Sequence, residues 1–485
     1  MHRFTRFAVS LTPLVPLLVS AGCASTNPGP AFDGVAETLR SRSGVEARWV
    51  RSEAEGAEVR RAVEALLAQP LDAEAAARVA LLNSPEVQAE LESLGIAQAD
   101  LAQATRIANP SLEAFARRPR GGGTTNLEFG VAQDLLDILV QPLRRRMGEA
   151  ELAETQLRVG DRLSRTVAEA KSALYTVQAS EQRVERLGAI AALDRAAFDL
   201  AERQSKAGNL PDLDLAVQQA AYEQSRIELL RARVEARADR EVLNRVLGAT
   251  GDLAESTVAA GLPPLPESDP GPSGLETMAL ENRLDLAAGR YAVDLVGRAL
   301  ALKKGTRFFP AGIEVGVSRE RDSDRTVVLG PTLRLQIPLF DTGRASIARL
   351  EAQERQSRRQ LEALAVRARS EVREAHARLA GAREQVAEYE RVLLPLRARI
   401  LDQTLRHYNM MLKGVYDVLL ARQAEVAAEE AAIAGRRDYW LARVELERAV
   451  GGRLPAATPA NTVPATPAPQ PEPETTHQHP PGGSR

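Results

Sequence analysis

The sequence has little of three things on which many folded enzymes depend: aromatic residues, cysteine and an excess of one charge. Aromatic residues make up 4% of the chain, which is a thin supply for an enzyme core built on Phe, Tyr and Trp. The formal net charge is -2 at pH 7, so no polyanionic partner is indicated and nucleic-acid binding is not expected. The charged residues instead alternate in sign among Ala and Leu, a pattern typical of long solvated helices.

The scarcity of cysteine excludes an internal disulfide and directs attention to the N-terminus. Cys23 is the only cysteine in the chain. It follows the apolar run 7–19, which begins after Arg3 and Arg6 and is interrupted by proline. That run is too short to span a bilayer stably, and it predicts a secretory signal peptide over residues 1–22.

Residues 20–23, Ser-Ala-Gly-Cys, resemble a bacterial lipobox. The resemblance implies that Cys23 carries palmitate-type lipidation and begins a lipidated N-terminal segment over residues 23–70. Ala24 stands where Asp would retain a lipoprotein in the inner membrane, so a lipid anchor in the outer membrane is implied. The alternative is an ordinary signal peptide with a chance cysteine. Because one acyl-type anchor binds a membrane only marginally, a second membrane element is expected.

The chain contains one large internal duplication. Segments of the first half recur in the second half in the same order, about 200 residues further on. The pairs are 80–90 with 279–289, 106–116 with 307–317, 206–220 with 412–425, and 241–249 with 444–452. They predict a first repeat over 71–250 and a second over 276–452, joined by a Pro/Gly-rich linker at 251–275. Residues 453–485 read as a disordered, Pro-rich C-terminal tail.

Each repeat predicts a pair of strands with unlike faces. Alternating apolar and polar residues place strands at about 312–337 in the second repeat and, with weaker alternation, at about 111–133 in the first. Soluble hairpins are one interpretation. In lipid, however, four strands would leave open edges with unpaired backbone groups, which lipid does not tolerate. Single-chain barrels begin at about eight strands, so these strands would have to close by oligomerising, and a trimer would supply twelve.

A long helix and a shorter helix follow each strand pair. Apolar residues at steps of three and four form coiled-coil stripes along 143–207 and 344–412, each roughly 100 Å long if helical. The shorter helices are expected at about 211–248 and 416–450. Pro395 should bend the second long helix because it removes a backbone donor.

The turn from the last strand into the second long helix has a distinctive composition. Pro338, Phe340, Asp341 and Gly343 lie within it. Pro338 ends the strand ladder because it lacks a donor, and Gly343 permits the turn. The helix is then expected to continue beyond the membrane, into the periplasm.

The duplicated plan, the sequence PLFDTGR at 338–344, the tips KAGNL and LKGVYDVL, and the endings LGA and VGG resemble the TolC family of outer-membrane channel-tunnels. The resemblance covers about residues 71–452. It implies a mainly α fold with a small membrane β part, in which a homotrimer forms a 12-stranded β-barrel continued by a periplasmic α-helical coiled-coil barrel. It implies a passive exit duct without catalytic site or cofactor, docked by a periplasmic adaptor (membrane fusion) protein and an inner-membrane efflux pump.

The resemblance also assigns roles to the helix tips. The adaptor would dock at Gly208, Asn209, Leu210, Gly414, Val415 and Tyr416. A periplasmic gate that favours cations would be formed by Asp212, Asp214 and Asp417, because like charges brought together by three chains are costly until the gate opens or binds a cation. Leu420 stands where some members carry a further Asp, so a hydrophobic gate is an alternative to a charged one. The alternative for these aspartates is a solvated first-turn acid favoured by the helix dipole.

The substrate is indicated only by resemblance. Residues 80–110 look like members associated with heavy-metal efflux, and lipid-anchored members mostly serve proton-driven pumps of the resistance-nodulation-division type. A multidrug or solvent outlet and a type I secretion outlet are the alternatives, and a periplasmic coiled-coil scaffold lipoprotein is the rival from another class. His477 and His479 in the tail are weak metal candidates, and no other metal site is expected. An enzyme would need a nucleophile–base or metal-ligand cluster that the sequence does not offer.

Overall fold

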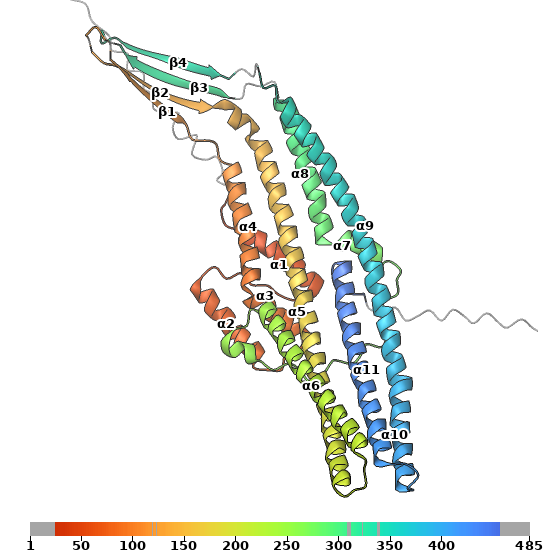
Figure 1. The fold of residues 1–485 in the computed structure, drawn as a ribbon. Coiled ribbons are helices and arrows are strands. Elements are labelled where there is room, and N and C mark those ends of the chain that lie inside the picture. Colours follow the sequence, from red (N-terminus) through yellow and green to blue (C-terminus); the bar gives the residue numbers. More distant parts are fainter. Residues whose placement is uncertain are drawn as a thin grey trace, which may run out of the picture.

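The structure is a computed structural model that describes residues 25–118, 120–122, 124–307, 312–322, 324–336 and 340–455. Cys23, Pro338, His477 and His479 lie outside these residues. The described chain is elongated and mainly helical, with a small sheet at one end and two helical hairpin tips at the opposite end (Figure 1).

The two repeats contain corresponding elements, preceded by two extra helices. In chain order the elements are α1 (Gly29–Ser43), α2 (Glu53–Leu67), α3 (Ala73–Asn83), α4 (Pro85–Ala104), β1 (Ser111–Arg117), β2 (Asn126–Asp134), α5 (Leu135–Lys206), α6 (Asp212–Leu247), the 3-10 turn η2 (Gly251–Glu255), α7 (Leu275–Asn282), α8 (Leu284–Thr306), β3 (Ile313–Arg321), β4 (Val327–Leu335), α9 (Arg344–Glu388), the π-helical η3 (Tyr389–Leu393), α10 (Leu394–Asn409) and α11 (Val415–Val450).

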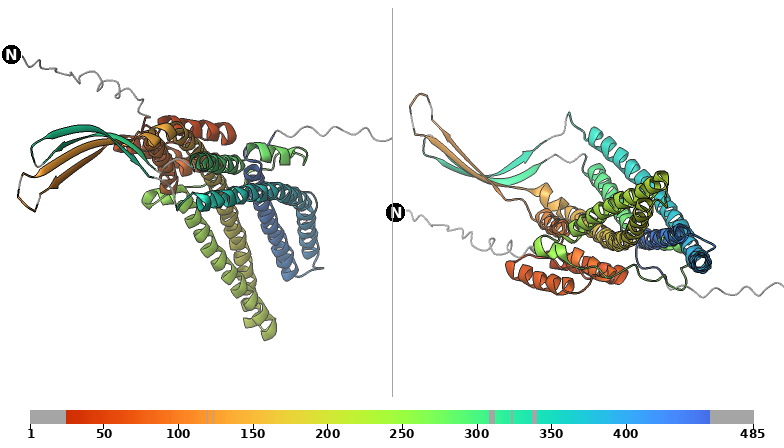
Figure 2. Two further views of the ribbon diagram at one scale, coloured as in Figure 1. Left: turned by 90° about the horizontal axis from the view of Figure 1, so that it is seen from above. Right: turned by 60° about the horizontal axis from the view of Figure 1, so that its bottom comes forward.

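The strands form a single antiparallel sheet in the order β1-β2-β3-β4. Each repeat supplies one hairpin, and the β2–β3 pairing joins the two repeats. The hairpin ends lie at the end of the sheet farthest from the helices, and the sheet bends visibly when seen from above (Figures 1 and 2).

The first long helix starts earlier than the sequence pattern predicts. α5 begins at Leu135 and not near 143, since the Asp134 carboxylate accepts hydrogen bonds from the backbone N–H groups of Leu136 (2.8 Å) and Asp137 (3.2 Å). This cap lets the helix start directly from the last residue of β2, and Pro142 is accommodated inside it. The result is a 72-residue helix, which is roughly 110 Å long.

The second long helix is interrupted just before Pro395, the position at which the sequence predicts a bend. Residues Tyr389–Leu393 form a π turn, in which the N–H of Leu394 donates to the carbonyl of Tyr389. Pro395 follows as the second residue of α10. A proline lacks an N–H group and its ring presses on the preceding turn, and widening that turn relieves both problems.

The core is concentrated at mid-height of the helical part. There α1 and the segment after it pack on α4 and α5, burying Val35, Leu39 and Trp49 against Leu91 and Leu163. The residues 25–70, which the sequence marks as a lipidated N-terminal segment, are therefore largely folded onto the first repeat. A separate cluster on α7, α9 and α11 forms the core of the second repeat.

Both repeats close with the same contact. Gly248 ends α6 and Gly451 ends α11, each in the left-handed region with φ of 64° and 79°. A Cβ on Gly248 would lie 2.9 Å from the Cα of Ser84, and one on Gly451 would lie 2.9 Å from the backbone N of Arg283. Glycine is thus required twice over at these positions, by its φ and by the approach of another backbone.

Candidate functional site: a two-faced sheet and two helix tips

One face of the sheet is mostly apolar across all four strands, with Gln133, Arg319 and Arg321 as its polar residues. The pairing register places these side chains together: Leu112, Ala114, Ala116, Leu127, Phe129, Val131, Ile313, Val315, Val317, Val327, Leu329, Pro331, Leu333 and Leu335. Many are exposed in the single chain, with Leu112 at 74% and Leu329 at 68%. A contiguous exposed apolar face of this kind marks a surface that contacts lipid or protein.

The opposite face carries the strand carboxylates and is concave. Arg334 on β4 pairs with Glu314 on the adjacent strand and with Glu113 on β1, at 2.7 Å in each case. β1 and β4 are the two edges of the sheet, so a side chain can join them only if the sheet curls towards this face. Residues from all four strands line the resulting hollow. The polar face therefore lies inside the curve and the apolar face outside it.

The sheet edges are open in the described chain. β1 pairs only with β2, and β4 only with β3, among the residues that the structure describes. Their outer sides present unpaired backbone donors and acceptors, which can accept another strand.

The two strand-to-helix connections differ. β2 passes into α5 without a loop, as described above, whereas β4 reaches α9 through a short connection that includes Phe340, Asp341 and Gly343. Asp341 accepts a hydrogen bond from the N–H of Gly343 at 2.8 Å, and Gly343 adopts a φ of 72° as the N-cap of α9. Phe340 is fully exposed. The sequence-predicted turn residues that the structure describes thus lie at this connection, while Pro338 is outside the described part.

The first tip reverses the chain between α5 and α6. Gly208 has a φ of 76° and donates its N–H to the carbonyl of Ser205, while Asn209 donates to Gln204. These two bonds are those of a Schellman motif, in which a left-handed residue ends a helix. Leu210 follows, and Pro211 is the N-cap of α6. Nothing lies within 4 Å of a Cβ built on Gly208.

The second tip uses the same motif with a different residue. Met411, not Gly414, adopts the left-handed conformation, with a φ of 60°. Its N–H donates to Tyr408, and the N–H of Leu412 donates to His407. Gly414 is extended and serves as the N-cap of α11. Glycine is the usual residue at such a helix end, but in the second repeat the left-handed position is taken by Met411 and not by Gly414.

The candidate gate residues lie in the first turns of α6 and α11. Asp212 and Asp214 are exposed at the start of α6. Asp417 accepts a hydrogen bond from the N–H of Gly414 at 2.9 Å and pairs with Lys413 at 3.3 Å. The Gly414 bond, with Lys413, lowers the pKa of Asp417. Within one chain, Asp417 thus caps its own helix, as a first-turn acid does.

The tips are also tied to each other by a contact between Tyr416 and Gln204, a residue that the sequence does not single out. Tyr416 donates from its hydroxyl to the side-chain oxygen of Gln204 on α5 at 3.0 Å. Partial burial, reinforced by the charge of Asp214, raises the pKa of Tyr416. Val415 precedes it as the first residue of α11. The contact joins the two repeats close to the reversal points, and only the fold brings these residues together.

Further polar contacts between the hairpins lie above the tips. Gln423 on α11 donates to Asp194 on α5, which is 4% exposed. Burial raises the pKa of Asp194. Arg183 on α5 pairs with Glu430 at 2.6 Å, and Arg186 with Glu429 at 3.1 Å. A row of polar side chains, rather than an apolar seam alone, thus holds α11 against α5 over this stretch.

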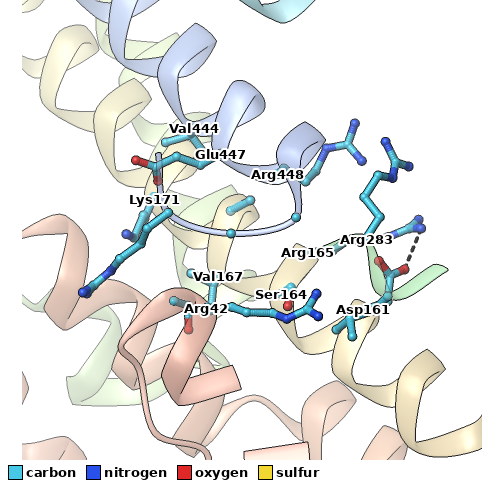
Figure 3. Close-up of a pocket in the computed structure, with 16 residues that line it drawn as sticks. Arg42, Asp161, Ser164, Arg165, Val167, Lys171, Arg283, Val444, Glu447 and Arg448 are labelled. Atoms are coloured by element: carbon cyan, nitrogen blue, oxygen red, sulfur yellow. Dashed lines mark ion pairs between the residues drawn. The ribbon is translucent and has the colours of Figure 1, made fainter. Parts of the chain in front are cut away.

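A pocket at mid-height marks the junction of both repeats with the N-terminal segment (Figure 3). Arg283 lies on one side and is 6% exposed. Although burial opposes it, hydrogen bonds to Asp285 and Glu371 raise the pKa of Arg283. Arg165 pairs with Asp161 at 2.7 Å across the pocket wall. Most of the positive charge of the pocket is therefore balanced by carboxylates of the chain itself, which is the arrangement of a structural junction.

Within the described ranges, no group of three or more His, Cys, Asp or Glu residues is placed to hold a metal ion. Over the same part of the chain, none of the helices combines the length and the apolar character needed to cross a bilayer.

Comparison with known proteins identifies the fold. No protein-family model matches the chain, and no curated protein matches it in sequence. Solved structures do match. The outer membrane protein VceC from Vibrio cholerae has a TM-score of 0.65 at 17% identity, over 81% of this chain and 96% of VceC.

Two further structures agree with this match. The outer membrane channel CmeC from Campylobacter jejuni has a TM-score of 0.64 at 14% identity, over 82% of this chain and 86% of CmeC. CusC, which forms a transmembrane channel, has a TM-score of 0.62 at 16% identity, over 81% of this chain and 92% of CusC. The chain has the fold of these outer-membrane channels, which confirms the mainly α, TolC-like fold of the single chain. The homotrimer and its 12-stranded barrel stay predictions.

Proposed function

We propose that this chain is a TolC-like outer-membrane channel that serves as the passive, trimeric exit duct of a tripartite efflux system. The observation that carries the proposal is the sheet. The sheet curls with its polar face inwards and exposes an apolar face outwards. Both of its edges are open, and it is followed by helices roughly 100 Å long. A membrane barrel segment joined to a tunnel requires all four features together.

Three copies would complete the barrel. β4 of one chain would pair with β1 of the next, so that twelve strands close without an edge. The apolar faces would then meet lipid, and the ion pairs around Arg334 would line a water-filled lumen. Cys23 would add a lipid anchor in the outer membrane, and the helices would extend through the periplasm.

The helix tips would form the periplasmic mouth. Gly208, Asn209 and Leu210 on one hairpin, and Gly414, Val415 and Tyr416 on the other, are proposed to dock the adaptor protein, which connects the duct to an inner-membrane pump. Asp212, Asp214 and Asp417 are proposed to narrow the mouth. The contact between Tyr416 and Gln204 would hold the second hairpin in the closed position.

Heavy-metal cations are the proposed cargo, selected by the pump and not by the duct. The motif resemblance of residues 80–110 supports this, and His477 and His479 would add a weak metal-capturing tail. A multidrug or type I secretion outlet is the alternative. Inhibitory concentrations of copper, silver, zinc, cobalt and cadmium for a deletion strain, set beside those of hydrophobic drugs, separate the two.

Engineered cysteines test the barrel directly. With Cys23 retained for lipidation, Leu112→Cys on edge strand β1 is combined in turn with Leu329→Cys and Leu333→Cys on edge strand β4, all on the apolar face. Oxidation in isolated outer membranes should give covalent dimers and trimers on denaturing gels for at least one pair, because the two edges meet between chains.

The matched control places both cysteines on the inner strands. Val131→Cys with Val317→Cys are register partners within one chain, so they should form only an intramolecular bridge. If every edge pair stayed monomeric while the control bridged, closure by edge pairing would be excluded and the scaffold alternative would be favoured.

A further inference from the structure

The strand arginines are divided between the two faces of the sheet, and the two groups have different partners. On the polar face, Arg334 pairs with Glu113 and Glu314, and Arg117 pairs with Glu128 at 3.5 Å. Arg319 and Arg321 have the opposite parity on β3 and share the apolar, convex face with Val315 and Val317.

Arg319 and Arg321 lie among apolar side chains. Arg319 is flanked by Phe129 on β2 and Leu329 on β4, and Arg321 by Leu127 and Val327. Both arginines are exposed, and neither makes an ion pair with a described residue. Two residues apart on one strand, they lie roughly 7 Å from each other on the same face.

The sheet itself offers these two arginines no counter-charge on their face. The strand carboxylates all have the parity of the concave face: Glu113, Glu128, Asp134, Glu314 and Glu320. A second copy of the chain is also a poor partner. β3 is an inner strand, and the convex face of another copy would present the same unpaired arginines.

From this placement we propose that Arg319 and Arg321 form a binding site for the phosphate groups of a lipid in the outer leaflet, whose acyl chains lie along the apolar side chains below. The inference rests on the proposed insertion of the sheet in the membrane. Both arginines lie near the β3–β4 turn, at the end of the sheet farthest from the helices (Figure 1). That end would reach the outer surface. A phosphate-bearing lipid matches both halves of the site, because it carries an anionic head beside an apolar body.

Lipid retention by the full-length, purified protein tests the site. The protein is reconstituted into phosphatidylcholine vesicles that contain either phosphorylated or dephosphorylated lipid A, and bound lipid is quantified after extraction. The wild type should retain the phosphorylated form selectively. The double variant R319Q/R321Q should lose about 30-fold in this preference, since each arginine near a charged headgroup contributes about a fivefold effect.

Two controls make the result specific. R117Q/R334Q removes the same number of strand arginines from the concave face and should keep the preference. R319K/R321K keeps the charge and should restore most of it. Equal retention of both lipids by the wild type, an unchanged preference in R319Q/R321Q, or full competition by inorganic phosphate would each overturn the site.

Failure of the site and failure of the channel proposal can be told apart. Carbonate extraction of the same vesicles reports insertion independently of lipid preference. Inserted protein without a preference for phosphorylated lipid A refutes the arginine site and leaves the channel intact. Protein that carbonate removes from the vesicles refutes both.

Discussion

The two helical hairpins have corresponding elements in the same order, but different residues end and interrupt their helices. The closing helices α6 and α11 are both 36 residues long and end with the same glycine contact. The long helices differ: α5 is continuous, whereas α9, η3 and α10 share the same span with a π turn in between. The two repeats share the same backbone geometry at the ends of α6 and α11, where another backbone lies in contact. They differ along the long helices, where only side chains or solvent lie nearby.

The largest expected difference lies at the start of the paired helices. Ser84 and Arg283 cap α4 and α8 with nearly identical backbone angles, but only Arg283 makes buried ion pairs, with Asp285 at 2.7 Å and Glu371 at 2.5 Å. Arg283→Ala should cost about 3 kcal/mol, because it leaves the partly buried Asp285 without its partner and leaves Glu371 with Arg448 alone. Ser84→Ala should cost about 1 kcal/mol or less, since its side chain makes no capping bond.

Thermal unfolding of both variants in detergent, followed by circular dichroism, checks this contrast. Arg283→Lys is the control that keeps one charge but loses the fork of hydrogen bonds, and it should fall between the two. Equal midpoints for Arg283→Ala and Ser84→Ala would mean that the buried network contributes nothing to the second repeat.

Smaller changes in stability, opposite in sign to each other, are expected for substitutions at the two helix tips. Met411→Gly should stabilise the end of α10 by about 1 kcal/mol, because a side chain in the left-handed region is strained. Gly208→Met should destabilise the end of α5 by about the same amount, with no added clash, since the space around Gly208 is open. Hydrogen–deuterium exchange of the last turns reports each change locally, and shifts of the same sign would contradict a shared motif.

The smallest expected difference is in how stability depends on pH at Asp194 and Asp417, whose pKa values are shifted in opposite directions. Burial raises the pKa of Asp194 from its ordinary value of 3.8, so its contribution to stability is complete below that value and is lost as pH rises through the raised pKa. Asp194→Asn should therefore stabilise the protein at neutral pH. The gap to the wild type should close in acid.

Asp417 should behave in the reverse sense. Its pKa is lowered by the bond from Gly414, so its contribution is present above 3.8 and is lost as pH falls through the lowered pKa. Asp417→Asn should destabilise the protein at neutral pH, and that difference should vanish in acid. Melting temperatures of the two variants across an acid-to-neutral series check both signs, and parallel curves would refute the assignment.

Much of the architecture could be predicted from residue patterns because those patterns are local. Alternation marks β3 and β4, and steps of three and four mark the stripe through Ala368, Val372, Ala375 and Leu379, all of which are buried. The position of Asp417 in the first turn of a helix also follows from sequence alone. The start of α5 is predicted too late, because Asp134 caps the helix and Pro142, eight residues after Asp134, hides this start in the sequence pattern.

The parts that could not be predicted depend on which segments meet. Nothing near Gln204 in the sequence points to Tyr416, 212 positions away, and nothing near Met411 announces a left-handed residue. Met411 takes the left-handed position because the two hydrogen bonds of the Schellman motif end on Tyr408 and His407. Gly414 lies three residues later and is extended, so a nearby glycine does not identify the left-handed residue.

The element types and the two-sided character of each strand follow from the order of residues alone, because periodicity and turn-forming residues within a few positions set them. Which side chains meet depends on how the chain packs. Only the register of the four strands shows that every strand carboxylate shares the concave face while Arg319 and Arg321 share the other. Only the curl of the sheet lets Arg334 reach Glu113. Charge pairing acts through space, so its partners are set by packing and not by order along the chain.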